Sequence, residues 1–502
     1  MYRKLLIVMM CAVCAAAQAQ IEVRTEIQAT AADGDHNPLW LNANKYGLSS
    51  LDKTNGYVRA GAFRPLANDS AKEWGWGAGV DVAVATGFTS TLVVQQAYGE
   101  LRWLKGLLTV GSKQQPMELR HQELSSGAQT LGINARPVPS IRLSLPEYWN
   151  IPYTNGWLAL KGHIAYGMMT DDNWQKDFTQ RQTRYTEHSM LHPKAGYLRI
   201  GKHRLTAELG LEMACQYGGT SYMVGAEQLT VENEGGLKGS IKALIPGGGE
   251  AIETIYRNTS GNHLGSWLAR VNLDYDEWGV SVYGDHFFED QSAMFQVDYD
   301  GYGTGSEWNV KKDIRLFLYD LRDMMLGAEL RLKQTPWLNT VVAEYLYTKY
   351  QSGPVYHDHT QQIASDIGGR DEYYNHSIMT GWQHWGQVMG NPLYRSPLYN
   401  SSREIMIEDN RFWAWHLGVA GDPLPGLHYR ALLTWQKGFG RYDMPFANPQ
   451  KNVSMLAEAC YTFSEKSRLA GWSVTGSFAL DRGELLGDNV GAQVTVRKNV
   501  KM

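Results

Sequence analysis

The amino-acid sequence predicts an all-β protein: an antiparallel β-barrel of about 18 strands, of the type that spans a bacterial outer membrane. Three observations predict this fold. Many segments alternate strictly between apolar and polar residues, their apolar faces often begin or end in Trp or Tyr, and the connections alternate between long and short. Alternation places a strand between water and an apolar medium. Rings at strand ends and sorted loop lengths are typical of a barrel in a bilayer.

The composition excludes other classes of protein. The chain has 502 residues and a formal charge of −4, with 47 Lys and Arg against 51 Asp and Glu, and 11% aromatic residues. This amount of apolar material excludes a disordered chain, and the charge balance excludes a basic nucleic-acid binder. The 17 Trp and 28 Tyr outnumber the 12 Phe. Rings that carry a polar atom are typical of wet interfaces, which include sugar-binding surfaces.

The N-terminus has the features of a secretory signal peptide. Two basic residues precede a short apolar run, and Ala17 and Ala19 fit the small-residue pattern of a cleavage site. We therefore expect residues 1–19 to be a signal peptide and residues 20–502 to form a single outer-membrane barrel domain. No later apolar stretch is long enough for a transmembrane helix, which excludes a helical membrane protein but not a barrel.

Only two cysteines, Cys215 and Cys460, follow the predicted signal peptide. Two cysteines make neither a disulfide framework nor a metal-binding set. One disulfide between them is an alternative, but two unpaired thiols within strands are the favoured interpretation.

Residues 204–213 illustrate the alternation on which the strand assignment rests. Polar residues such as Glu208 share one face of this segment, and aliphatic residues such as Leu209 share the other. Many such segments run for about ten residues, which is the length that a tilted strand needs to cross a bilayer. The pattern predicts strands at 21–29, 56–63, 75–85, 91–104, 107–113, 138–146, 156–167, 195–202, 203–214, 266–276, 278–286, 325–333, 338–348, 412–420, 427–437, 453–463, 470–481 and 489–499.

The lengths of the connections give an independent check on this assignment. Long connections follow mostly odd strands, at 30–55, 114–137, 168–194, 215–265, 287–324 and 349–411, whereas those after even strands are short. An outer-membrane barrel has this asymmetry, with tight turns on the periplasmic side and long loops outside. A sandwich or a propeller has no reason to sort its loops in this way. Both termini are then expected on the periplasmic side.

Three segments in the long connections are predicted to be short helices. Residues 116–124 have Pro near the start and Gly127 beyond the end, as helices often do. The other two are residues 239–245 and 250–256. Loops this long pack together or fold into the barrel as a plug, because a barrel of this size otherwise encloses an aqueous channel.

Several stretches carry a resemblance to a known family. They are residues 37–47, 125–127, 134–139, 261–265, 286–292, 373–376, 382–386 and 390–393. In this order they resemble the Wzi-type capsule assembly family over nearly the whole mature chain. The resemblance implies a barrel occluded by its own segments that acts as a lectin and holds capsular polysaccharide on the cell surface. The chain departs from many outer-membrane barrels in ending at Met502 rather than at an aromatic residue.

The segment 349–411 is the richest in candidate binding residues. Flat rings stack on the apolar faces of sugars, and Asn, His and Arg bond hydroxyl and carboxylate groups, so a sugar site combines apolar surface with a few placed polar groups. The residues predicted to contact carbohydrate are Tyr373, Tyr374, Asn375, His376, Trp382, His384, Trp385 and Arg395. The alternative is a packed plug in which the same polar groups bond one another.

The arginines of this segment have two interpretations. Arg395, Arg403 and Arg411 could hold acidic groups of a glycan by paired hydrogen bonds. The favoured interpretation is an internal ladder in which they pair with Glu404, Glu408 and Asp409.

The sequence predicts no metal site, no cofactor and no enzyme activity. The best clusters for a metal ion are His357, Asp358, His359, His376 and His384 for a transition metal, and Asp298, Asp300 and Glu307 for calcium. Neither has a second feature that supports a ligand set. The carboxylate pairs Glu289–Asp290 and Asp371–Glu372 are neighbours in the chain, and neighbours on a strand point to opposite faces, whereas a glycosidase needs two that face each other.

The sequence therefore leads to one expected function and one alternative. The expected function is a non-catalytic barrel in the outer membrane that binds capsular polysaccharide and anchors it at the cell surface. Its expected partners are that polysaccharide and membrane lipid but not nucleic acid, and the polysaccharide export machinery is a further candidate. The alternative is an outer-membrane pore for oligosaccharides or other small solutes, which differs in having an open lumen.

Overall fold

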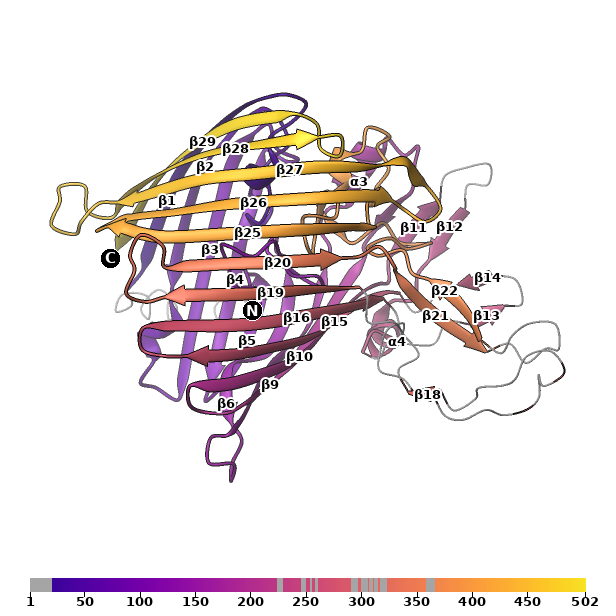
Figure 1. Cartoon of the computed structure of the whole chain (residues 1–502), viewed down its shortest axis with the longest axis horizontal. Coiled ribbons are helices and arrows are strands. Elements are labelled where there is room, and N and C mark those ends of the chain that lie inside the picture. The colour runs from indigo at the N-terminus through magenta and orange to yellow at the C-terminus, as the bar shows by residue number, and fades with distance from the viewer. Residues whose placement is uncertain are drawn as a thin grey trace, which may run out of the picture.

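The computed structural model describes residues 20–223, 229–244, 250–252, 255–257, 261–289, 297–298, 306, 310, 315–316, 323–357 and 366–502. These residues form one large barrel, with short connections at one end and long ones at the other (Figure 1). The predicted signal peptide, residues 1–19, lies outside the described residues and stays a prediction.

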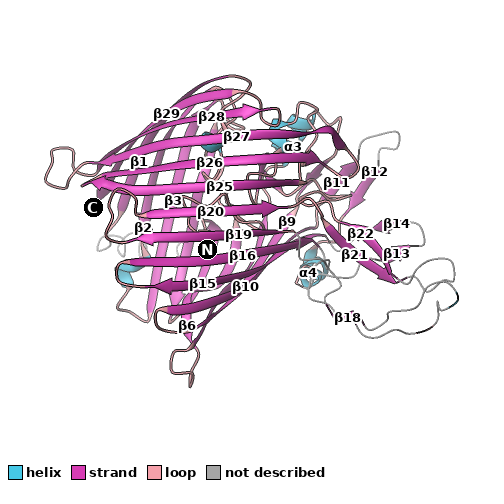
Figure 2. Cartoon of the chain, in the orientation of Figure 1, coloured by secondary structure: helices cyan, strands magenta, loops and turns pink. Residues whose placement is uncertain are grey.

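The barrel wall is an 18-stranded antiparallel sheet, which confirms the predicted fold class (Figure 2). Each predicted strand segment overlaps one observed strand. The strands are β1 (Glu22–Asp33), β2 (Thr54–Arg64), β3 (Trp74–Thr86), β4 (Leu92–Trp103), β5 (Gly106–Ser112), β6 (Ser140–Asn150), β7 (Leu158–Met168), β9 (Met190–Ile200), β10 (Leu205–Tyr217), β15 (Asn262–Asp274), β16 (Trp278–Glu289), β19 (Met324–Leu332), β20 (Thr340–Tyr347), β25 (Phe412–Leu424), β26 (Leu427–Gly440), β27 (Pro445–Thr462), β28 (Trp472–Gly483) and β29 (Asn489–Lys501).

The sheet closes on itself between its first and last strands. Ile27 of β1 lies opposite Val58 of β2 on one side and opposite Val496 of β29 on the other. The amide of Ile21 also donates to the carbonyl of Met502 at 3.1 Å. Closure removes the free edges of a sheet, so that the backbone groups of the wall bond one another, as a bilayer requires.

The two faces of the wall differ in polarity as the alternation predicts. Aliphatic side chains such as Val84 and Ile141 point outward and are 60% exposed. Charged side chains such as Asp81, Glu344 and Asp481 point inward, where they are at most 1% exposed. An apolar outer face and a polar lumen are the arrangement of a barrel that stands in a membrane.

The connections sort to the two ends of the barrel as predicted. The end that carries the C-terminus has only short connections, such as 104–105 and 425–426. The described parts of the long connections 113–139, 218–261 and 348–411 lie at the other end (Figure 1).

Aromatic pairs lie at both ends of the outer face. Trp74 and Trp103 stack at 5.6 Å between ring centroids near the short connections. Trp413 and Trp435 meet at 4.7 Å near the long ones. Rings in two such bands are typical of the two membrane–water boundaries.

The helical pieces are short. They are α2 (Leu39–Asn42), η1 (Leu66–Asp69), α3 (Asp172–Thr179), α4 (Gly236–Lys242) and η3 (Pro397–Tyr399). Within the described residues, the helices are too short and too polar to cross a bilayer. The predicted helix at 239–245 overlaps α4, and α3 was not predicted.

Two helix predictions were wrong. Residues 116–124 form an irregular turn in which Leu119 has a positive φ of 57° and the side chain of Gln122 accepts from the Met117 amide at 2.8 Å. Residues 250–256 contain part of a hairpin, β13 (Glu250–Ile252) and β14 (Ile255–Arg257). Ile and Tyr, which are frequent here, favour strands.

Candidate functional site

Three segments of the long connections fold into the lumen, and we refer to them together as the plug: residues 34–53, 113–139 and 371–411. The first contributes α2, whose residues are all buried. The amide of Leu39 donates to Asp481 of β28 at 3.0 Å, and the indole of Trp40 donates to the hydroxyl of Thr434 of β26 at 3.1 Å. The polar groups of the wall thus bond the plug instead of water.

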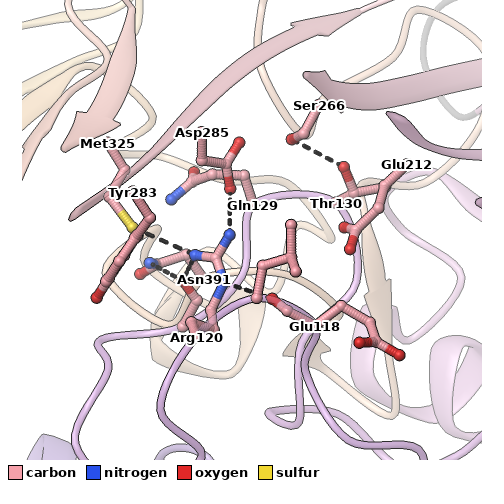
Figure 3. A network of polar contacts seen from close by, with 12 residues as sticks. Glu118, Arg120, Gln129, Thr130, Glu212, Ser266, Tyr283, Asp285, Met325 and Asn391 are labelled. Atoms are coloured by element: carbon pink, nitrogen blue, oxygen red, sulfur yellow. Dashed lines mark hydrogen bonds and ion pairs between the residues drawn. The ribbon is translucent and has the colours of Figure 1, made fainter. Parts of the chain in front are cut away.

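The second segment is anchored by two buried carboxylates of the wall. Arg120 reaches from the plug to Asp285 of β16, with 2.7 Å between its Nη2 and the carboxylate oxygen (Figure 3). The hydroxyl of Ser125 and the amide of Ser126 donate to Glu344 of β20 at 2.6 and 2.8 Å. Each carboxylate finds a donor that lies far away in the sequence, as buried charges require.

The third segment packs on the second through its aromatic residues. The hydroxyl of Tyr374 donates to the carbonyl of Gln129, and its ring stacks on Tyr394 at 4.0 Å. The indole of Trp382 donates to the carbonyl of Thr130 at 2.8 Å. These contacts join the two plug segments into one body inside the barrel.

Five of the eight residues predicted to contact carbohydrate lie inside this body. They are Tyr373, Tyr374, Asn375, Trp382 and His384, each at most 5% exposed. Asn375 exchanges two hydrogen bonds with the backbone of Ile407, at 2.8 and 2.9 Å. Their rings and amides contact other parts of the plug, the wall and neighbouring connections, as in the packed alternative that the sequence left open.

The other three predicted residues, His376, Trp385 and Arg395, keep part of their surface exposed. Trp385 has a positive φ of 56°, and its ring lies under the guanidinium of Arg136 at 4.4 Å. Its amide donates to Asp171 at 3.2 Å. These contacts hold the Trp385 ring in one orientation.

The predicted ladder of arginines and carboxylates forms in part. Arg395 pairs with Glu408, as expected. Arg411 instead donates to the carbonyl of Lys349 at 3.2 Å and lies 3.6 Å above the ring of Tyr442.

Burial shifts the pKa values of several titratable groups of the plug, among them His384 and Asp409. Burial lowers the pKa of His384, whose Nδ1 lies 2.9 Å from the carbonyl oxygen of Arg136, so this ring is neutral. Burial raises the pKa of Asp409 to about 7, although the amides of Phe439 and Gly440 donate to it at 3.0 and 2.9 Å and oppose the shift.

The predicted metal cluster includes His376 and His384 of the plug, whereas the calcium and cysteine predictions concern residues outside it. Within the part of the chain that the structure describes, no group of three or more His, Cys, Asp or Glu side chains is placed to hold a metal ion. The calcium candidates Asp300 and Glu307, and Asp358 and His359 of the other cluster, lie outside the described residues. Among the described residues, Cys215 and Cys460 form no disulfide, as favoured.

A cavity of about 330 Å³ remains between the plug and one side of the wall. Its wall side is formed by β5, β6, β7, β9 and β10, and its plug side mainly by residues 113–118 and 130–138. The volume falls within the range of ligand pockets, about 300–1,000 Å³. Arg142 of β6 and His163 of β7 are among the lining residues.

Sequence reasoning missed both the anchors of the plug and this cavity. The alternation shows that Arg142 and Glu344 face the lumen, because each lies among outward aliphatic residues. It does not show which of them meets a partner, since Ser125 and Glu344 are 219 residues apart in the chain.

Comparisons with known proteins agree on the fold. No family model matches the chain, and no curated protein matches it. Among solved structures, it is similar to Wzi of Escherichia coli, described as an outer membrane protein involved in group 1 capsule assembly and a carbohydrate-binding β-barrel. That likeness has a TM-score of 0.53 and 13% identity, over 98% of this chain and 87% of that one.

Two further structures are OprD of Pseudomonas aeruginosa and OccAB4 of Acinetobacter baumannii. OprD has a TM-score of 0.46 and 10% identity, over 97% of this chain and 96% of the other. OccAB4 has a TM-score of 0.45 and 11% identity, over 97% and 99%. Together with the closed wall and its apolar outer face, the likeness to Wzi shows that this chain has the fold of an 18-stranded outer-membrane β-barrel.

Proposed function

We propose that this protein resides in the outer membrane, where it binds capsular polysaccharide and anchors it at the cell surface without catalysis. The observation that carries this proposal is an apolar core inside the barrel. Leu41, Trp382 and Tyr394 of the plug pack in one cluster with Phe412, Leu432 and Leu456 of the wall. A pore needs a continuous path of water, and a close-packed core opposes one.

The anchors of the plug support the same conclusion. The Arg120–Asp285 pair is at most 2% exposed, and Glu344 is 1% exposed. Removing such a partner leaves a buried charge unpaired, which costs about 3–5 kcal/mol. A plug held in this way resists displacement by a passing solute.

The likeness to Wzi supports the choice of ligand. Wzi is described as carbohydrate-binding, and the resemblance of sequence motifs points to the same class of glycan. Of the predicted contacts, Trp385, His376 and Arg395 have exposed surface for a sugar. The export machinery of the polysaccharide remains a proposed partner.

A capsule-retention experiment tests this function. Cells that lack the native protein receive either the wild-type chain or the double variant Trp385→Ala and Arg395→Ala, and the polysaccharide that stays on washed cells is measured. We expect the variant to retain about tenfold less, because the loss of a stacking contact and a charge-assisted contact corresponds to at least about 1.4 kcal/mol.

The matched control is Trp337→Ala. Trp337 is 70% exposed and lies in a connection at the short-connection end, away from the plug segment 371–411. Equal retention of polysaccharide by the wild type and the double variant would mean that the polysaccharide binds at other residues. A steady open conductance of the wild-type chain in a planar bilayer would contradict the proposal and favour the pore.

A further inference from the structure

The cavity beside the plug has a cationic lining, and the guanidinium of Arg142 in this lining is one that no carboxylate of the described residues neutralises. Within the described residues, Arg142 forms no hydrogen bond or ion pair, although its side chain faces the lumen. Its orientation follows from the register, because Arg142 lies opposite Thr109 of β5 and Ala165 of β7, which are both buried. A charge held in the lumen without a partner is costly unless a ligand supplies one.

The carboxylates nearest to Arg142 already have partners. Glu118 of the plug pairs with Lys161 of β7. Glu212 of β10 accepts from the hydroxyl of Tyr197 at 2.6 Å. Both attract the guanidinium of Arg142 from a distance, but neither forms an ion pair with it.

Of the other basic groups around the cavity, Lys113 pairs with Glu100, which does not line it, and Lys194 donates to the carbonyl of Ala243 at 2.8 Å. Arg136 donates to the hydroxyls of Ser90 and Thr89 at 2.8 and 2.7 Å, and its Nε has no partner. His163 adds a ring nitrogen to the lining. The balance of charge in the cavity is therefore positive, which favours an anion.

The rest of the lining indicates what kind of anion fits. Leu107, Leu131 and Met389 supply apolar surface, and Thr109 and Ser140 supply hydroxyls. A guanidinium binds a carboxylate through two parallel hydrogen bonds. Hydroxyls bond the hydroxyls of a sugar, and the apolar side chains pack on its C–H face. Phosphate or chloride would use the charge but not the apolar surface.

We propose that this cavity binds a sugar unit that carries a carboxylate, with Arg142 as the residue that receives the carboxylate. This inference rests on the proposed function for the choice of a sugar, and it adds the acidic class of the sugar and the place where it is held.

The cavity adjoins a second space at the end with the short connections. Lys161 lines both the cavity and a wider bowl of about 570 Å³, to which Glu208, Arg270 and Glu329 also contribute. These residues lie near the strand ends that carry short connections. Lys161, which pairs with Glu118, therefore lies between the bowl and the cavity.

Calorimetric titration of the full-length mature chain in detergent tests the proposal. The ligands are D-glucuronate, D-glucose and acetate. We expect glucuronate to bind more tightly than either of the others, because only it carries both the carboxylate and the sugar ring. The variant Arg142→Gln should lose affinity for glucuronate by about tenfold or more, as expected when a charged hydrogen-bonding partner is removed. The affinity of the variant Arg142→Lys for glucuronate should lie between those of the wild type and of Arg142→Gln.

The matched control is Arg430→Gln. Arg430 is also a luminal arginine, but it is neutralised by Glu458 at 2.7 Å and does not line the cavity. It should bind glucuronate like the wild type. Unfolding temperatures separate binding from folding, because removal of an unpaired charge should leave Arg142→Gln at least as stable as the wild type.

Two results would overturn the inference: no binding of glucuronate to the wild type, or equal binding to wild type and Arg142→Gln. Equal affinity for acetate and glucuronate would overturn the assignment of a sugar. The proposed function fails separately, since a chain that binds glucuronate but retains no capsule contradicts only that function. A chain that retains capsule but binds no glucuronate contradicts only this inference.

Discussion

The two sides of the lumen differ in how the plug meets the wall. Against β16, β20, β25, β26, β27 and β28, the plug forms a dry core, in which Leu41 and Trp382 pack with Phe412 and Leu432. On the side of β5, β6, β7, β9 and β10, a cavity of about 330 Å³ remains between the plug and part of the wall. The charged groups follow the same division. Arg120 and Asp285 pair on the dry side, whereas Arg142 forms no ion pair among the described residues on the other.

This difference indicates that the two sides of the plug have different roles: one is fixed against the wall, and the other leaves space for a ligand. Close packing and paired charges contribute stability, so the dry side fixes the position of the plug. An unfilled space and an unpaired charge cost stability, and such features are typical of sites kept for a ligand. Variants on the two sides should therefore behave differently.

The largest effect is expected when an anchor of the dry side is removed. Arg120→Ala leaves the carboxylate of Asp285 buried without its cation, which should lower the free energy of unfolding by about 3–5 kcal/mol. The temperature at which the barrel unfolds, measured by heat-dependent gel migration, would show the loss. An Arg120→Ala chain as stable as the wild type would mean that the plug does not depend on this pair.

A pair of leucine variants compares the two sides directly. Leu124 is fully buried against the backbone of Gly418 on the dry side, whereas Leu107 is 9% exposed and lines the cavity. Leu124→Ala should cost about 2–5 kcal/mol, and Leu107→Ala should fall at or below the lower end of that range, because its neighbours are already loosely packed. Equal losses in unfolding temperature would contradict the division of the lumen.

The smallest effect concerns the pH dependence of stability. Because burial raises the pKa of Asp409 from an ordinary value of 3.8 to about 7, the folded chain holds a proton in this window that the unfolded chain has released. Stability from this group is therefore greatest at low pH and falls as pH rises from about 4 to about 7.

Asp409→Asn should flatten this pH dependence, since the amide cannot ionise. Unfolding temperatures of both chains at pH 5 and pH 8 provide the measurement. A wild-type chain whose stability does not change between these values would show that Asp409 stays ionised in the folded protein.

The sequence predicts a feature of this structure well when the contacts involved join residues that are close in the chain, and poorly when they join distant ones. The wall was predicted strand by strand, because Glu208 and Leu209 reveal their opposite faces through their position alone. The helix at 116–124 was predicted from Pro116 and Gly127 but does not form, because Arg120 is drawn to Asp285. Contacts between distant residues leave no local pattern.

The predicted carbohydrate contacts in residues 349–411 also depend on contacts between distant residues. Tyr374 and Trp385 are equally plausible sugar contacts in the sequence, yet one is 1% exposed and the other keeps exposed surface. The hydrogen bond from Trp382 to Thr130 spans 252 residues, so the burial of Trp382 depends on how the plug folds.

The sequence by itself determined that this chain is a barrel with an apolar outer face, that its wall has about 18 strands, and that its long loops gather at one end. Each of these properties follows from the period of two and from the order of connections, which neighbouring residues express. Only the tertiary structure decided which rings became core, which charges paired, and where a cavity remained around Arg142. Those outcomes depend on how three separate segments fill one enclosed volume.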